Sequence, residues 1–196
     1  MKNYNLFITI VFLFNINIVF GQFGEQKEIS QSTAGFRSIC SYDLDGDSYL
    51  DVLAISAEKV FWYKNDGNGN FGSQQVIVYN IGDVESVYAD DIDADGDLDV
   101  FFGTSNTIYW CKNDGTGNFE SEQIINVNID GLRCIITSDI DGDGYTDVLS
   151  SSGVDNKIAW YQNEGAGNFG AEQVITTNAN GVKSVSKANE LLSKLF

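Results

Sequence analysis

One short acidic pattern constrains this chain more than any other feature, because it occurs three times at a fixed interval. In each copy, aspartates stand at the first, third, fifth and ninth positions of a nine-residue stretch that leads into an apolar run. The first aspartates of the copies are residues 43, 91 and 139, so each copy starts 48 residues after the previous one. A fixed period of this length is typical of repeat architectures. The sequence therefore predicts a tandem array of one structural unit, with one acidic loop in each unit.

The segments around the loops predict the fold class. Each repeat has one strand-forming segment before the loop, two after it and a fourth beyond a turn rich in Asn, Asp and Gly. The predicted strands are 36–42, 51–55, 60–63, 75–79, 84–89, 99–102, 107–110, 123–126, 132–137, 147–149, 157–161 and 173–176. No repeat shows a helical period, and four strands in about 48 residues is the size of one β-propeller blade. We expect an all-β fold of antiparallel blades, with three full repeats and partial units at both ends.

The acidic loops are the candidate metal sites. Alternate side chains of such a loop point to one side, so the first, third and fifth aspartates can direct carboxylates at one cation, with the ninth closing the shell. The seventh residue offers its backbone carbonyl. An all-oxygen site with several carboxylates favours Ca²⁺ over zinc or copper, and we expect about one Ca²⁺ per loop. The candidate ligands are Asp43, Asp45, Asp47, Tyr49, Asp51, Asp91, Asp93, Asp95, Asp97, Asp99, Asp139, Asp141, Asp143, Tyr145 and Asp147.

The loops open like an EF-hand but differ from it in two respects. An EF-hand has a bidentate Glu at position 12, where this chain has Ala54, Phe102 and Ser150. Helices flank an EF-hand loop, whereas strands are predicted here. The alternative interpretation, a solvated Asp-rich turn that binds nothing, explains one copy better than three copies in register.

The order of features in a repeat resembles the FG-GAP/VCBS repeat family, whose relatives include the integrin α-chain propellers. The pattern consists, in order, of a strand, the acidic loop, a second strand, Trp-Tyr-x-Asn, a Gly-rich turn and Phe-Gly. Tryptophan recurs at Trp62, Trp110 and Trp160, and one Phe-Gly pair is replaced by Phe119-Glu120. The resemblance covers about residues 22–187. It implies propeller blades stabilised by calcium, with partners bound by other loops, in secreted or surface proteins of adhesion, recognition or carbohydrate binding.

The two ends fall outside the repeats. Residues 1–21 are predicted to be a signal peptide, because Lys2 precedes an apolar run that is shorter than the ~20 residues of a membrane span. A membrane anchor is the alternative interpretation. Residues 22–187 form the repeat region, and 188–196 are a divergent tail, since the position that matches Asp139 is Asn189. We expect a secreted or cell-surface protein with no membrane span after cleavage.

Composition narrows the function. The net charge of −17, with no basic patch, argues against a nucleic-acid partner. The chain has no His and no motif that pairs a nucleophile with a base, so we expect no enzyme activity. The predicted function is adhesion to, or recognition of, an extracellular protein or glycan by a calcium-binding module whose blades the ions stabilise. The alternatives are a fragment or accessory propeller of an exported carbohydrate-active enzyme, or a lectin that stacks sugars on tryptophan. Packing of the tryptophans between blades is the favoured interpretation.

Three full repeats do not make a closed propeller, which usually has four to eight blades. Three explanations remain open: truncation from a longer protein, which we favour, a ring shared between copies, or an open array. Exposed blade edges would permit self-association.

Overall fold

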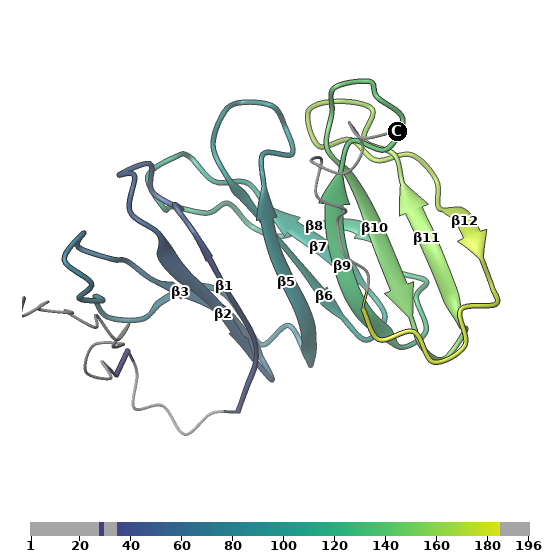
Figure 1. The fold of residues 1–196 in the computed structure, drawn as a ribbon, viewed down its shortest axis with the longest axis horizontal. Helices are drawn as coiled ribbons and strands as arrows, with labels where there is room; N and C mark the ends of the chain where they lie inside the picture. The colour runs from purple at the N-terminus through teal and green to yellow at the C-terminus, as the bar shows by residue number, and fades with distance from the viewer. Residues whose placement is uncertain (1–27, 30–34, 185–196) are drawn as a thin grey trace, which may run out of the picture.

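The computed structural model describes residues 28–29 and 35–184, which contain twelve β-strands and no helix. The strands form three four-stranded antiparallel sheets, each with its strands in chain order. We call them blade 1 (β1–β4), blade 2 (β5–β8) and blade 3 (β9–β12), and they lie side by side (Figure 1). The strand bounds are β1 Phe36–Tyr42, β2 Asp51–Ser56, β3 Lys59–Tyr63, β4 Gln75–Tyr79, β5 Val84–Asp90, β6 Asp99–Thr104, β7 Ile108–Cys111, β8 Gln123–Asn126, β9 Leu132–Ser138, β10 Asp147–Ser152, β11 Lys157–Tyr161 and β12 Gln173–Thr176.

The predicted all-β class and the four-strand repeat are confirmed. The second strand of each blade runs further than predicted, to Ser56, Thr104 and Ser152. These polar ends belong to the hairpin that follows, where Ser56 pairs with Lys59 and Ser152 pairs with Lys157. Polar and glycine residues weaken a strand signal, although backbone pairing in a hairpin does not require apolar side chains.

The hydrophobic core lies between the blades rather than within one sheet. Leu53 and Val60 of blade 1 pack in one buried cluster with Val84 and Phe102 of blade 2. The opposite face of blade 2 contributes Phe101 to a second cluster shared with blade 3. Blade 2 is therefore covered on both faces, which explains why all six residues of β6 are buried.

The tryptophan column packs across the blade junctions. Trp62 and Trp110 are only 2% and 3% exposed. Each ring lies against a glycine in the turn of the following blade, Gly117 for Trp62 and Gly167 for Trp110. A Cβ atom at these glycines would lie 2.5 Å and 2.4 Å from the ring, and both have a positive φ. Trp62 and Trp110 therefore pack between blades. Trp160 is partly exposed, because no described blade follows blade 3.

The predicted signal peptide (1–21) and tail (188–196) lie outside the described residues. The described part of the chain contains no helix that is long and apolar enough to cross a membrane. Its three blades do not close into a ring, which fits an incomplete propeller.

Candidate metal centres

Each acidic loop joins the first strand of its blade to the second, and we call them loop 1, loop 2 and loop 3 in chain order. The aspartate at position 1 curls the loop by accepting backbone N–H groups from inside it. The carboxylate oxygens of Asp43 accept from Asp47 (3.1 Å) and Ser48 (2.7 Å). Asp91 makes the same pair of bonds in loop 2. Position 1 therefore shapes the loop as well as offering a ligand.

The aspartate at position 9 is buried and ties three segments together. Asp51, Asp99 and Asp147 are each 0% exposed. One oxygen of Asp99 accepts the N–H of Ile92 in the loop (3.2 Å), and the other accepts the N–H of Asn113 in the following turn (2.8 Å). The other two blades repeat both bonds. Burial raises the pKa of Asp99 to about 7, with a smaller contribution from the charges of Asp93 and Asp95, so a bound cation would favour its charged form.

Three carboxylates converge in every loop. Oxygens from positions 1, 3 and 9 lie within 4.8 Å of one another, and the residues are Asp43, Asp45 and Asp51; Asp91, Asp93 and Asp99; and Asp139, Asp141 and Asp147. The position-3 side chains of loops 1 and 2 are only 5% and 9% exposed. In both, the Oδ1 atom is buried and makes no hydrogen bond. Burying a bare carboxylate oxygen is costly, so this donor set fits a hard divalent cation such as Ca²⁺.

The predicted ligands at positions 5 and 7 are not part of these trios. One oxygen of Asp47 accepts the backbone N–H of Tyr49 (3.0 Å), and the other loops repeat this bond. The Tyr49 ring faces Gly67 in the following turn. Ca²⁺ takes six to eight oxygens, so the position-5 carboxylate and position-7 carbonyl could complete its shell. Their ligation stays a prediction, at Asp47, Asp95, Asp143, Tyr49, Asp97 and Tyr145.

Two loops hold a lysine ammonium that sequence reasoning missed. Nζ of Lys64 contacts Asp45 and lies 2.9 Å from Asp47. Lys112 contacts the equivalent aspartates of loop 2 and lies 2.8 Å from the position-5 oxygen. Loop 3 has Gln162 instead, whose Nε2 donates to Asp141 (2.6 Å). The signal was available, because Lys, Lys and Gln stand two residues after Trp62, Trp110 and Trp160. Loops 1 and 2 therefore carry a cation of their own.

A second missed feature connects loops 1 and 2 to the blade that follows each of them. Nδ2 of Asn113 in the blade 2 turn donates to the carbonyl of Leu44 in loop 1 (2.8 Å). Asn163 of blade 3 makes the equivalent bond to Ile92 in loop 2 (2.7 Å). Both asparagines are buried. The loops are therefore part of the blade junctions.

Two loop residues adopt a backbone conformation that suits glycine. Positions 4 and 6 have positive φ in all three loops, yet Ser48 (φ 71°) and Ala94 (φ 62°) occupy two of these places. We expect Ala94→Gly to raise the free energy of unfolding by about 0.5–1 kcal/mol, since the left-handed strain costs more than the added freedom of the unfolded chain. Denaturant unfolding measures the change. Gly144→Ala is the matched reverse, because an added Cβ there meets nothing within 4 Å. Destabilisation by Ala94→Gly would contradict the strain.

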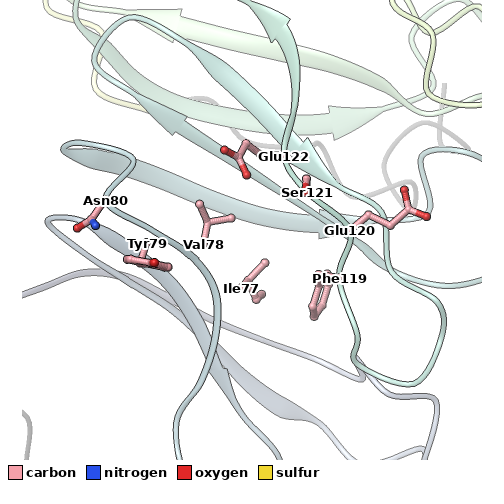
Figure 2. Close-up of a pocket in the computed structure, with 8 residues that line it drawn as sticks. All are labelled: Ile77, Val78, Tyr79, Asn80, Phe119, Glu120, Ser121 and Glu122. Atoms are coloured by element: carbon pink, nitrogen blue, oxygen red, sulfur yellow. The ribbon is translucent and has the colours of Figure 1, made fainter.

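A groove of about 440 Å³ lies between blades 1 and 2, away from the loops. Figure 2 shows its lining side chains from the end of β4 and from the segment before β8. Tyr79 is 67% exposed. Asn80, Glu120 and Glu122 add polar groups to the lining of the groove. This combination offers one aromatic face beside hydrogen-bonding groups.

Four-stranded blades that each carry one convergent carboxylate loop define a class, the β-propeller repeat with candidate metal loops. The profile of the FG-GAP-like repeat matches residues 43–102, 91–150 and 139–188. The chain therefore belongs to the FG-GAP-like repeat family, as its sequence predicted.

One solved lectin structure has a similar fold at low sequence identity. A lectin from Agrocybe aegerita, described as recognising non-reducing terminal N-acetylglucosamine, has a TM-score of 0.57 at 22% identity, over 73% of this chain and 39% of the lectin. The Photorhabdus luminescens Tc holotoxin pore matches with a TM-score of 0.44 at 18% identity, over 70% of this chain and 7% of that chain. The chain thus spans about two-fifths of the lectin's length. No functionally curated protein matches the chain.

Proposed function

We propose that this chain is a calcium-binding β-propeller repeat module for recognition or adhesion outside the cell, without chemistry of its own. The observation that carries the proposal is the carboxylate trio of each loop, with oxygens within 4.8 Å of one another. At Asp45 and Asp93 the trio includes a buried oxygen that makes no hydrogen bond. FG-GAP repeats are typical of extracellular proteins, where calcium is freely available.

The trio gives a bound ion a structural role. Three carboxylates at this separation repel one another, and a divalent cation would turn that repulsion into attraction. Positions 1 and 3 lie in the loop, whereas position 9 opens the second strand and accepts an N–H from the turn. An ion held by all three therefore fixes the loop, the strand and the turn in one arrangement. The loop also contacts the next blade through Asn113 or Asn163, so the ion supports the blade junction too.

Calorimetric titration of the chain with Ca²⁺ tests the proposal. We expect about one ion per loop. Asp93→Asn should remove one binding event, because Asp93 belongs to the trio of loop 2. Asp97→Asn is the matched control, since it removes a carboxylate from the same loop but outside the trio. Equal loss of binding in both variants would show that total charge matters rather than the trio, and an absence of binding heat in the parent chain would reject the site.

Lysine in the loop gives a further prediction about affinity. Lys112→Gln gives loop 2 the residue that loop 3 has, and it removes an ammonium that competes with the metal for Asp93 and Asp95. We expect calcium affinity of loop 2 to rise roughly three- to tenfold, which corresponds to ~1 kcal/mol for a partly exposed ion pair. Calorimetry on the variant measures the change. The control is Lys59→Gln, which removes a charge at the start of β3 and should leave the calcium affinity of loop 2 unaltered. If Lys112→Gln leaves that affinity unchanged or weakens it, Lys112 does not compete with calcium.

Glycan recognition is the second candidate, and the groove between blades 1 and 2 favours it. The exposed ring of Tyr79 could stack on a sugar, with Glu122 and Asn80 as hydrogen-bonding groups (Figure 2). The lectin neighbour suggests N-acetylglucosamine as the first ligand to try. Trp62 and Trp110 are buried, so a lectin that stacks sugars on these tryptophans is disfavoured. Binding on a glycan array that Tyr79→Ala abolishes and the control Val76→Ala preserves would support this candidate. Binding that survives Tyr79→Ala would reject the groove.

A further inference from the structure

Blade 3 exposes the apolar face that blades 1 and 2 bury against the blade that follows them. The residue at loop position 2 shows this most clearly. Leu44 and Ile92 are 1% and 0% exposed, because the next blade covers them, whereas Ile140 is 40% exposed. All three are large aliphatic residues at the same place in the repeat. The difference lies in the neighbour and not in the sequence.

Other columns on this face change in the same way. Trp160 is partly exposed, although the tryptophans of the same column in blades 1 and 2 are buried. Ile175 of β12 is 57% exposed, whereas its counterparts in β4 and β8 pack against the two cores. The adjacent strand position behaves differently, since Val174 is exposed and so are its counterparts Val76 and Ile124. The increase in exposure at blade 3 therefore occurs in the columns that face the next blade.

Blade 1 exposes part of the opposite face. Phe36 and Ile39 on β1 are 45% and 64% exposed, whereas the residues in the same columns of β5 and β9 are all buried. The turn of blade 1 also lacks the contact to a preceding blade that the turns of blades 2 and 3 make. Asn65 donates from Nδ2 to Leu50 of its own blade, where the equivalent asparagines also reach the preceding blade. On β2 and β3 the same face is already buried within the chain, where Ala54, Phe61 and Tyr63 pack with Ile29, so its uncovered part is limited to β1 and the turn.

We propose that these two faces are the halves of one head-to-tail interface between two copies of this chain. The interface would repeat the part of the internal blade junction that the first strand and the turn form. Trp160 of one copy would pack on the turn of blade 1 (residues 65–70) in the other copy. Asn65 of that turn would donate to the carbonyl of Ile140 in the first copy. The second copy is the occupant we infer because both end faces expose residues whose counterparts pack together at the two internal junctions. This inference does not depend on the proposed function.

The arrangement has a definite stoichiometry. The two faces differ, so the contact is heterologous and either closes into a ring or continues as an open polymer. Two copies of the three described blades supply six, within the range of about four to eight blades in closed propellers. We therefore infer a closed pair that holds two such interfaces.

Sedimentation velocity over a wide concentration range tests the pair. We expect a species of twice the 21.5 kDa chain mass. Ile175→Glu should convert it to monomer, because a charge then faces the apolar junction. Val174→Glu is the matched control and should stay paired, since its column is exposed in every blade. A parent chain that is monomeric throughout would overturn the proposal, as would equal dissociation by both variants.

A mixing experiment tests the head-to-tail geometry. Ile39→Glu alters the blade 1 face and should also give monomer. Mixing the Ile39→Glu and Ile175→Glu chains should restore pairs, because one of the two interfaces in the mixed pair joins two unaltered faces. A like-with-like contact between two blade 3 faces would leave the Ile39→Glu chain paired, and that result would overturn the geometry, as would a mixture that stays monomeric. Thermal melts of both variants confirm that they fold, since both altered residues are exposed.

Discussion

Asp99→Ala is expected to lower the free energy of unfolding by about 3 kcal/mol even in chelator, because two buried N–H donors lose their acceptor at ~1–3 kcal/mol each. The donors are Ile92 and Asn113, which approach the two oxygens of the carboxylate at 3.2 Å and 2.8 Å. In calcium the loss should be larger, since the variant also lacks a ligand from the trio. Urea unfolding in chelator and in calcium separates the two contributions.

Asp99→Asn is the control for this variant. Its carbonyl oxygen can still accept one of the two N–H groups, and it removes a charge that burial disfavours, as the raised pKa of Asp99 shows. In chelator it should therefore cost clearly less than Asp99→Ala, while calcium should stabilise it less than the parent chain. If Asp99→Ala lowers the free energy of unfolding by less than about 1 kcal/mol, as an ordinary surface substitution does, the bridging role of Asp99 is contradicted.

Gly117→Ala is expected to destabilise the protein by about 2–5 kcal/mol, the sum of left-handed strain and displacement of a buried ring. The new Cβ would lie 2.5 Å from the ring of Trp62, at a residue with a φ of 80°. The damage falls on the junction between blades 1 and 2. Denaturant unfolding, compared with Gly144→Ala, isolates the packing contribution, because Gly144 shares the positive φ but has open space around it.

A double-mutant cycle checks that Trp62 is the cause. In a Trp62→Ala background, Gly117→Ala should cost only the backbone strain, so the two substitutions should be strongly non-additive. Additive effects would contradict the packing of this ring on the turn.

The repeated pattern made most of the fold predictable. Each strand signal occurs three times in register, and strands such as β4, β8 and β12 have the predicted bounds. The loops were recognisable because their aspartates are close in sequence. Which of them converge was not predictable: position 9 reaches the trio because it opens a strand beneath the loop, whereas Asp47 and its counterparts turn toward a backbone N–H.

Contacts between blades could not be predicted from the sequence. Asn113 and Leu44 lie 69 residues apart, and only stacking of the blades brings them together. Lys64 and Lys112 reach their loops from the end of the third strand, and this depends on the sheet register. Local sequence patterns specify the strands and turns of one blade. The contacts of Asn113, Lys64 and Lys112 join segments that only packing brings together.

The measurement that tests the central claim most directly is a thermal melt of the chain in Ca²⁺ and in chelator, with Mg²⁺ as a control for ionic strength. Three structural ions should raise the melting temperature by at least about 10 °C, and the increase should grow with the calcium concentration, because ligands that bind only the folded state stabilise it by mass action. Mg²⁺, which dehydrates reluctantly and demands octahedral geometry, should have a much smaller effect. Melting curves that superimpose in Ca²⁺ and chelator would contradict the claim that the loops are structural calcium sites.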